Sequence, residues 1–390
     1  MKPEQYSIPL SVPEIKGNEM RYIKKCLDTN WVSSAGRYVD SFENKMLGYI
    51  GRKYAIACVN GTAALHIALL AAGIKPDEEA IVPALTFVAT ANVLRYANAW
   101  PVFIDVEPDT WQIDAQRIAD FLNKECVWKN GRLINRNTRR AIKAIMPVHL
   151  LGHPADMGPI MRLAHKFGLL VIADAAQGLG ALYKGRHAAG FGDIACLSFN
   201  GNKIITTGGG GMLLTDRPEW AKRARYLITQ ARDDSSEFIH NEVGYNYRLT
   251  NIQAAMGIAQ MENIGKHITR KRSIARHYQA GLKDIPGIRL PVESVYARSI
   301  FWLYTIRINK VKTGIGSREL LRKLNAGGIQ ARPLWHPLHS LRPFKRSYAY
   351  RIKVANELYR DCLSLPSSVG LAQSDQDKVI NVIRESTIKK

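Results

Sequence analysis

The sequence predicts an α/β protein with a mostly parallel central sheet, helices on both faces of that sheet, and a small α+β domain after it. From residue 54 to residue 173, short apolar runs alternate with segments of helical periodicity, as in a doubly wound parallel sheet. Beyond residue 214 the pattern changes to long helices and then to mixed strands and helices. We therefore expect a large domain over residues 1–255 and a small one over residues 256–390, with an N-terminal arm that can pack on the small domain.

The individual elements follow from apolar periodicity and from start and stop residues. Strands are expected at residues 54–59, 80–84, 101–105, 141–150, 169–173 and 301–308. Helices are expected at residues 17–28, 38–50, 60–72, 87–96, 114–124, 157–167, 218–230, 251–281 and 318–327. A basic, asparagine-rich stretch over residues 124–140 is expected to be an exposed insertion. One helix carries a basic run that we interpret as a solvated face, with phosphate binding as the alternative: Lys266, Arg270, Lys271, Arg272 and Arg276.

Composition limits the class of protein. A hydrophobic content of 46% and a charged content of 23% are ordinary for a globular chain. No run is long enough to span a bilayer, and the start, Met-Lys-Pro-Glu-Gln-Tyr-Ser, has no apolar signal region, so a cytoplasmic protein is expected. The five cysteines are scattered and form no C-x-x-C pair. They are interpreted as reduced packing residues that form neither a disulfide framework nor a metal site.

The net charge is strongly positive, because 55 Lys and Arg residues oppose 33 Asp and Glu residues, which gives +22. Such a surplus favours anionic partners: nucleic acid, an anionic membrane or phosphorylated small molecules. A non-catalytic nucleic-acid-binding protein is one alternative for the whole chain. However, the sequence has no helix-turn-helix extension and no aromatic-basic platform, so no nucleic-acid partner is expected.

The stretch over residues 198–212 is the first candidate for chemistry. Lys203 is its single charged residue, between an apolar run and four successive glycines. An apolar site disfavours the ammonium form of a lysine, lowers its pKa and makes the amine a nucleophile. The alternative is an ordinary surface lysine in a glycine-rich hairpin.

Several familiar cofactor sites are excluded. The sequence has no G-x-x-x-x-G-K-[ST] motif, and the Gly178-Leu-Gly180 turn lacks a correctly placed third glycine for a dinucleotide fingerprint. His149 and His153 could suggest a metal. Because glycine and proline interrupt any helix that would place both on one face, no metal is expected.

Pyridoxal 5'-phosphate (PLP) makes demands that other residues can meet. It needs a lysine, a carboxylate for the pyridine nitrogen, an aromatic face and an anion nest. Asp174 ends an apolar strand, at the edge where α/β sheets bind ligands, and Gln177 could reach a ring substituent. Phe87 offers the aromatic face. Gly61, Thr62 and Ala63 open a helix after a strand and offer the nest. The combination of these residues therefore indicates a PLP site more specifically than any one of them does alone.

At this point the chain resembles the sugar-nucleotide aminotransferases of the DegT/StrS type, which are fold-type I, aspartate-aminotransferase-like PLP enzymes. The resemblance covers nearly the whole chain. Its marks are Asn60-Gly-Thr-Ala-Ala-Leu65, Thr86-Phe-Val-Ala-Thr90, Pro147-Val-His149, Asp174-Ala-Ala-Gln177, Ser198-Phe-Asn-Gly-Asn-Lys203, Gly208–Gly211, Gly244-Tyr-Asn-Tyr-Arg248 and Arg332-Pro-Leu-Trp335.

The resemblance implies roles for these residues. Lys203 would hold the cofactor as a Schiff base and then move the proton between cofactor and sugar carbon. Asp174 would pair with the pyridine nitrogen, Gln177 with the ring oxygen, and Phe87 would stack on the ring. The phosphate would be held by Gly61, Thr62, Ala63 and Ser198, and by Asn246 from a neighbouring subunit, so a homodimer is implied. Substrate contacts would come from Trp31, Arg332 and His336.

The resemblance also implies a substrate class. The marks are most similar to enzymes that aminate C4 of a UDP-4-keto-6-deoxy-N-acetylhexosamine with glutamate as amino donor, for bacterial surface-glycan biosynthesis. GDP-perosamine synthases, or aminotransferases of another sugar nucleotide, are the alternative. Family members that dehydrate their substrate carry histidine in place of this lysine, and the intact Lys203 argues against that branch.

Overall fold

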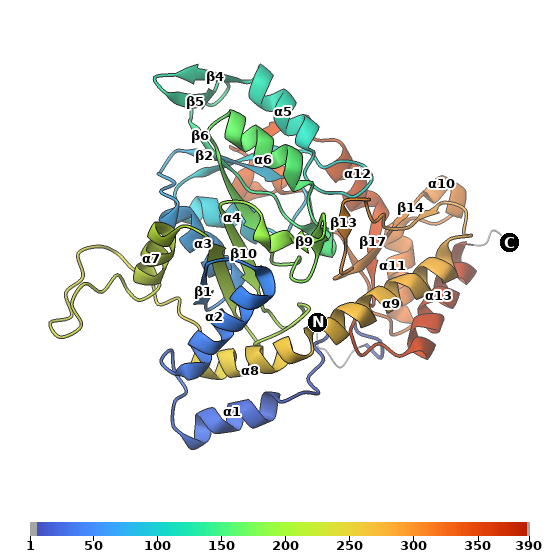
Figure 1. Ribbon diagram of the computed structural model, residues 1–390. Helices are drawn as coiled ribbons and strands as arrows, with labels where there is room; N and C mark the ends of the chain where they lie inside the picture. Colours follow the sequence, from blue (N-terminus) through green and yellow to red (C-terminus); the bar gives the residue numbers. More distant parts are fainter. Residues whose placement is uncertain (1–5, 388–390) are drawn as a thin grey trace.

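The computed structural model of the chain describes residues 6–387. The first residues of the chain, where the sequence shows no apolar signal region, therefore lie mostly outside the described residues. An eight-stranded sheet forms the centre of the larger part of the molecule, with helices packed around it (Figure 1). No helix among the described residues is long and apolar enough to cross a membrane.

The central sheet is mostly parallel, as predicted. Its two antiparallel pairs both involve β11, which follows β10 after a glycine-rich loop without a helix, whereas parallel neighbours are usually joined by a crossover helix. One edge strand, β16, comes from far along the chain and is not predicted from the sequence. In spatial order the strands are β1 (Tyr54–Cys58), β11 (Gly211–Thr215), β10 (Ile194–Ser198), β7 (Leu170–Asp174), β6 (Ile142–Ile145), β2 (Glu79–Pro83), β3 (Trp100–Ile104) and β16 (Tyr348–Tyr350).

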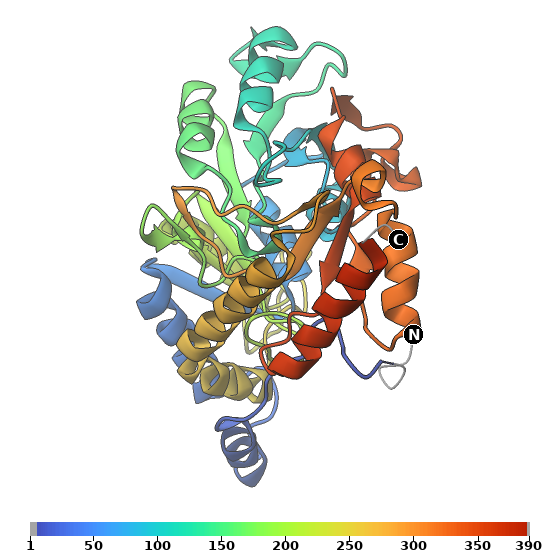
Figure 2. The ribbon, with the colours of Figure 1, turned by 90° about the vertical axis from the view of Figure 1, so that its right-hand side faces the viewer.

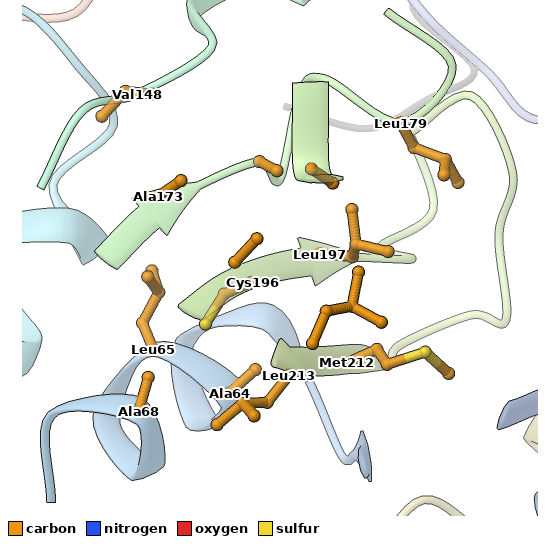
Figure 3. Packing of buried hydrophobic residues seen from close by; sticks show 14 of the residues in the cluster. Ala64, Leu65, Ala68, Val148, Ala173, Leu179, Cys196, Leu197, Met212 and Leu213 are labelled. Carbon is orange, nitrogen blue, oxygen red and sulfur yellow. The ribbon is translucent and has the colours of Figure 1, made fainter. Parts of the chain in front are cut away.

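Helices bury both faces of this sheet. On one face, Leu65 and Ala68 of α3 lie against Cys196 of β10 in a fully apolar layer (Figure 3). On the other face, Phe121 of α5 and Ile160 of α6 belong to a second buried cluster. The helices of the larger part are α1 (Glu19–Asp28), α2 (Arg37–Ile50), α3 (Gly61–Ala71), α4 (Ala89–Tyr96), α5 (Ala115–Lys124), α6 (Met157–Lys166), α7 (Pro218–Leu227) and α8 (Asn251–Glu262).

A separate apolar core lies in the C-terminal part, where helices α9 and α13 lie side by side (Figure 2). Ile8 of the N-terminal arm is buried in this core, and its backbone bonds to Gly328 and Gln330. The elements here are α9 (Ile264–Leu282), α10 (Lys310–Thr313), α11 (Ser317–Ala326), α12 (Val354–Asp361), α13 (Gln373–Thr387), and a sheet of β12 (Ile288–Arg289), β14 (Tyr304–Ile308), β17 (Cys362–Leu365) and β15 (Arg332–Pro333).

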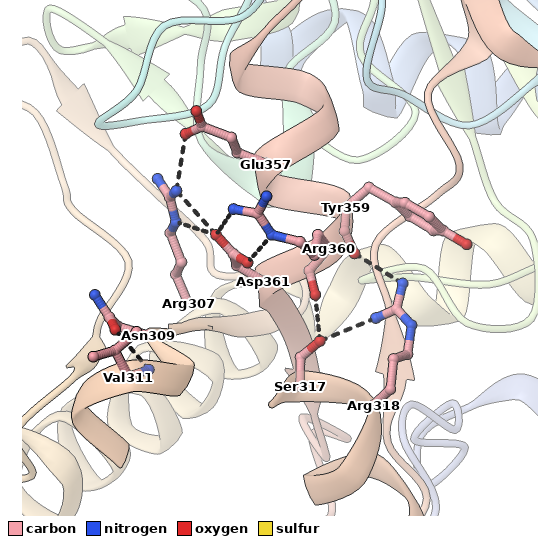
Figure 4. Close-up of polar contacts among 9 residues, drawn as sticks. All are labelled: Arg307, Asn309, Val311, Ser317, Arg318, Glu357, Tyr359, Arg360 and Asp361. Carbon is pink, nitrogen blue, oxygen red and sulfur yellow. Dashed lines mark hydrogen bonds and ion pairs between the residues drawn. The ribbon is translucent and has the colours of Figure 1, made fainter. Parts of the chain in front are cut away.

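Helix α12 contacts both cores, and the division at residue 255 stays a prediction. The Asp105 carboxylate, just after β3, accepts backbone N–H groups at the start of α12, including those of Val354 and Ala355. At the other end of α12, Asp361 and Glu357 bind the Arg307 guanidinium of β14 (Figure 4). Helix α12 therefore ties the central sheet to the second core.

The structure differs from the sequence expectations in four elements. The strand expected over 141–150 spans only Ile142–Ile145. The helix expected over 251–281 is two helices, α8 and α9, which meet at Asn263. The strand expected over 301–308 begins only at Tyr304. The exposed basic insertion contains a hairpin of β4 (Cys126–Lys129) and β5 (Arg132–Asn135). Shorter elements are β8 (Leu182–Tyr183), β9 (Arg186–His187), β13 (Ala297–Arg298) and 3-10 turns at Leu150–Gly152, Ala188–Gly190, Leu338–Ser340 and Arg342–Phe344.

Candidate active site

Lys203 lies in the loop that joins β10 to β11. The Phe199 N–H donates to the Gly210 carbonyl (2.8 Å), which closes the base of the loop. Gly210 has a φ of 141°, where a side chain would be strained. The Lys203 side chain is partly buried, and its Nζ lies 4.0 Å from the ring centre of Trp302.

The surroundings of Lys203 favour the uncharged amine. Burial lowers the pKa of Lys203 to about 8, and the negative charge of Asp174 acts in the opposite direction. An amine with this pKa is uncharged more often at neutral pH than a solvated lysine, and is therefore a better nucleophile. The two side chains that the sequence singles out thus influence each other in the fold.

Asp174 is the last residue of β7, at the C-terminal edge of the parallel strands. Its buried carboxylate accepts hydrogen bonds from Thr90 Oγ1 (2.7 Å) and from the Ala176 N–H (3.0 Å). Burial raises the pKa of Asp174, whereas these two hydrogen bonds and the charge of Lys203 oppose the rise. A carboxylate has about four acceptor positions, so it retains room for one protonated partner.

Helix α3 begins beside this edge and offers an anion site. Asn60 caps the helix by accepting the Ala63 N–H at its Oδ1 (2.7 Å). Ala63 is therefore already paired, and the N–H groups of Gly61 and Thr62 have no acceptor within the helix. A Cβ atom at Gly61 would lie 2.7 Å from the Cβ of Ser198. The nest and the end of β10 thus form one cradle, which fits a phosphate.

A row of aromatic rings borders the lysine. Phe87 is 52% exposed and contacts Trp335 edge to face, with ring centres 6.5 Å apart. Trp335 stacks on Trp302 at 6.4 Å, and Trp302 lies against Lys203. The sequence gives no signal for Trp302, because its position results from packing between segments about 100 residues apart, as does its hydrogen bond from Nε1 to the Asn202 carbonyl (2.7 Å).

Lys271 on α9 binds the backbone of Trp302, one of these aromatic residues. Its burial corrects the expectation that the basic run is a solvated face. Its side chain is buried, and its Nζ donates to the carbonyls of Trp302 (2.8 Å) and Ser367. Burial lowers the pKa of Lys271 to about 7. The neighbouring Arg272 pairs with Glu293. This part of the basic run is therefore structural, because its hydrogen bonds hold loops of the same chain.

Two further expected cofactor residues have partners of their own. The buried Gln177 follows β7, and its Oε1 accepts the Leu151 N–H (2.7 Å). Asn246 is exposed and forms a β-bridge with Thr229. No contact between Asn246 and Lys203 is present within the single chain described.

The three expected substrate residues have different surroundings, and their role stays a prediction. Trp31 is 57% exposed and lines a cavity of about 640 Å³ beside α1 and α2. Arg332 is exposed at the start of β15. His336 bonds to Ser340 through Nδ1 (3.0 Å) and lies against the ring of Tyr359. Trp335 of the same segment contacts Phe87 and Trp302, although no role for Trp335 is predicted from the sequence.

The histidines considered as metal ligands have other partners. His149 is buried, its Nδ1 accepts the Ala155 N–H (3.1 Å), and burial lowers its pKa to about 4. His153 contacts the Pro154 carbonyl through its own Nδ1 (2.8 Å). Within residues 6–387 no group of three or more His, Cys, Asp or Glu side chains could hold a metal ion, and the five cysteine thiols are buried and free.

The residues present fit PLP. The low-pKa amine of Lys203, the buried carboxylate of Asp174 and the glycine cradle at Gly61 meet at one edge of the sheet. The amine can bind the cofactor aldehyde, the carboxylate can hold a protonated ring nitrogen, and the cradle can hold the phosphate.

Comparison with known proteins identifies the same family that the sequence marks resemble. The model of the DegT/DnrJ/EryC1/StrS aminotransferase family matches residues 13–384. The GDP-perosamine synthase of Caulobacter vibrioides is 40% identical over 376 residues, which cover 96% of each chain. That of Escherichia coli O157:H7 is 36% identical, covering 97% of this chain and 98% of the relative.

Solved structures share the fold. A DegT DnrJ EryC1 StrS aminotransferase from Brucella abortus superposes with a TM-score of 0.87 at 30% identity, covering 95% of this chain and 96% of that one. The predicted fold is thereby confirmed. The chain belongs to the DegT/DnrJ/EryC1/StrS aminotransferase family and is a PLP-dependent sugar aminotransferase.

Proposed function

We propose that the protein transfers an amino group from glutamate to C4 of a nucleotide-linked 4-keto-6-deoxy sugar, for the synthesis of a bacterial surface glycan. The observation that carries the proposal is the meeting of a low-pKa lysine, Lys203, with a buried carboxylate, Asp174, at the edge of the sheet where α3 begins. Such a site suits the movement of an amino group between two carbonyl compounds.

The chain's own residues have distinct parts in this proposal. PLP, when bound, supplies an aldehyde and an electron-withdrawing ring. Lys203 Nζ would hold the cofactor through its aldehyde and, when free, would move the proton at C4 of the sugar. Asp174 would keep the ring nitrogen protonated, and Thr90 fixes the orientation of the Asp174 carboxylate.

The cradle formed by Gly61, Thr62 and Ser198 would hold the phosphate. We propose that Asn246 of the partner subunit completes it, so that the enzyme works as a homodimer. Two observations support this: Asn246 is exposed in its own chain, and the segment that contains it continues from a loop that extends well away from the central sheet (Figure 1). We expect the protein to be a dimer in solution. We also expect its affinity for PLP to fall when Asn246 is replaced by alanine.

The nucleotide is proposed from the relatives. Two relatives that share 40% and 36% identity with the chain are GDP-perosamine synthases, which favours a GDP-linked keto sugar as the acceptor. The UDP-4-keto-6-deoxy-N-acetylhexosamine that the sequence marks suggest is placed second. Trp31, Arg332 and His336 stay predicted substrate contacts.

A substrate panel tests the proposal. The holoenzyme is incubated with glutamate and with GDP-, UDP- and dTDP-linked 4-keto-6-deoxy sugars, and release of 2-oxoglutarate is followed. Turnover is expected to be fastest with the GDP-linked sugar and absent in Lys203→Ala. Faster turnover with the UDP-linked sugar would transfer the assignment to the second acceptor, and no turnover with any 4-keto sugar would refute C4 amination.

A further inference from the structure

A cavity of about 420 Å³ lies in the C-terminal part of the chain, and none of its lining residues is among those proposed for catalysis. One wall is a face of α9, on which Arg272 and Arg276 lie one helical turn apart. The remaining lining comes from residues 290–293, which follow β12, and from Phe301 and Tyr304. A cavity of this volume can hold a small organic molecule.

The Tyr304 side chain gives the first indication of a ligand. It is only 2% exposed, its ring stacks on that of Tyr278 with ring centres 5.0 Å apart, and it lines the cavity. Its hydroxyl has no hydrogen-bond partner within the described residues 6–387, and protein atoms do not fully enclose it. Hydroxyl groups of buried side chains are nearly always hydrogen-bonded. The Tyr304 hydroxyl therefore has a free donor for a molecule that enters the cavity.

The walls of the cavity carry one cation without a partner. The Arg272 guanidinium pairs with Glu293 and donates to the Ser299 carbonyl (2.6 Å). Arg276 is exposed and forms no ion pair with any residue that the structure describes. Two arginines and one glutamate are the charged residues of the lining. Its net charge is therefore +1, and the unpaired charge is that of Arg276.

Apolar side chains form much of the remaining lining. Leu290 and Phe301 are half-buried and pack against the second core, and Val292 is 42% exposed. The ring centre of Phe301 lies 6.3 Å from that of Tyr304 and 5.8 Å from Cζ of Arg272. A molecule in the cavity therefore meets apolar surface as well as a free cation and a free hydroxyl.

We propose that this cavity binds an organic carboxylate with an apolar body. Arginine binds carboxylates through two parallel hydrogen bonds, and the single unpaired guanidinium of Arg276 matches a single negative charge. A phosphate monoester carries nearly two negative charges at neutral pH, which this lining does not balance. The Tyr304 hydroxyl would donate to a second polar atom of the ligand, and its apolar body would lie against Leu290 and Phe301.

The test is a titration of the PLP-loaded enzyme with indole-3-acetate, followed by saturation-transfer NMR. Two further probes separate the chemistries: indole-3-acetamide has the same shape without the charge, and phenyl phosphate replaces the carboxylate by a phosphate. Indole-3-acetate is expected to bind saturably and on the order of 10- to 100-fold more tightly than the amide, because hydrogen bonds to charged groups are the stronger ones. Phenyl phosphate should bind more weakly than indole-3-acetate.

Three variants locate the binding. Arg276→Gln should bind indole-3-acetate on the order of 10- to 100-fold more weakly, and Tyr304→Phe about 2- to 10-fold more weakly. Since the Tyr304 hydroxyl has no partner among the described residues, Tyr304→Phe should keep the wild-type midpoint of thermal unfolding. Lys283 is exposed and forms no ion pair in the part of the chain that the structure covers. Lys283→Gln is therefore the matched control for charge and should bind the probe as the wild type does.

Excess glutamate separates this cavity from the active site, because the proposed amino donor is itself a carboxylate. Binding to the cavity should be unchanged by glutamate, and all three variants should keep wild-type transamination, so the test does not depend on the proposed function. Several results would overturn the proposal: no saturable binding, equal affinity for the acetate and the amide, tighter binding of phenyl phosphate, full binding in Arg276→Gln, or displacement by glutamate.

Discussion

At the scale of single residues, the chemistry depends on where two amines are buried. Lys203 and Lys271 both have pKa values lowered by burial, to about 8 and about 7. Lys271 donates to the carbonyl oxygens of Trp302 and Ser367, whereas Lys203 lies over the Trp302 ring and its pKa is influenced by the charge of Asp174. Only Lys203 therefore combines a low pKa with a partner suited to the cofactor.

The pKa of Lys203 gives the first prediction. Because the amine loses its proton as the pH rises through about 8, the rate at which the apoenzyme binds PLP covalently should rise with pH and level off above that value. Stopped-flow absorbance after mixing with PLP measures this rate. A midpoint close to 10.5, the ordinary value for lysine, would mean that the amine is solvated.

The carboxylate gives the second prediction. Asp174→Asn keeps the size of the side chain but removes the charge that would hold a proton at the ring nitrogen, so kcat should fall on the order of 100- to 1,000-fold while the cofactor still attaches to Lys203. Thr90→Val removes one hydrogen bond to this carboxylate (2.7 Å) and should cost roughly 10- to 100-fold. Single-turnover kinetics measure both, and a Thr90→Ser variant that is as slow as Thr90→Val would argue against an orienting hydroxyl.

At the scale of elements, the start of α3 makes the phosphate cradle, and its shape depends on Gly61. A methyl group there would lie 2.7 Å from the Cβ of Ser198. Gly61→Ala should therefore force β10 and α3 apart, at a cost of about 1–3 kcal/mol. Gly48, inside α2, has open space around it, so Gly48→Ala is the matched control and should leave the cradle unchanged.

The measurement is the dissociation constant of PLP by equilibrium dialysis. We expect Gly61→Ala to bind the cofactor at least about tenfold more weakly, and Gly48→Ala to bind it as the wild type does. If both variants bind equally well, the helix start is not the phosphate site.

Some elements of the fold can be predicted from the sequence, and others cannot. The strand that ends at Asp174 is predicted, because its apolar residues form a local run over residues 169–173. Strand β16 (Tyr348–Tyr350) escapes prediction, since its three residues pair with β3 from about 250 residues away. The roles of Trp302 and Lys271 are not predicted for the same reason, because each residue acts through contacts between distant segments and neither belongs to a motif.

At the scale of the whole molecule, the buried amine of Lys271 links folding to pH. Burial lowers its pKa from 10.5 to about 7, so between these values the unfolded chain binds a proton that the folded chain does not. The free energy of unfolding contributed by this site therefore increases as the pH rises from 7 toward 10. Below about pH 7, Lys271 is charged in the folded chain as well, and the cost of burying that charge then lowers the free energy of unfolding by its full amount.

Lys271→Met should remove this dependence. The free energy of unfolding of the wild type should rise with pH more steeply than that of Lys271→Met, by up to about 1.4 kcal/mol per pH unit. Urea unfolding at a series of pH values between 7 and 10 measures the two slopes. Lys266→Met, at an exposed position on the same helix, should keep the wild-type slope, and parallel slopes for all three proteins would show that Lys271 is charged in the fold.

The central claim is that Lys203, rather than the second buried lysine, holds the cofactor. Borohydride reduction of the PLP-loaded enzyme, followed by peptide mapping with mass spectrometry, tests this most directly. We expect a yellow protein whose reduced cofactor is fixed on the peptide that contains Lys203. A protein that stays colourless with added PLP, or a cofactor fixed on the peptide that contains Lys271, would contradict it.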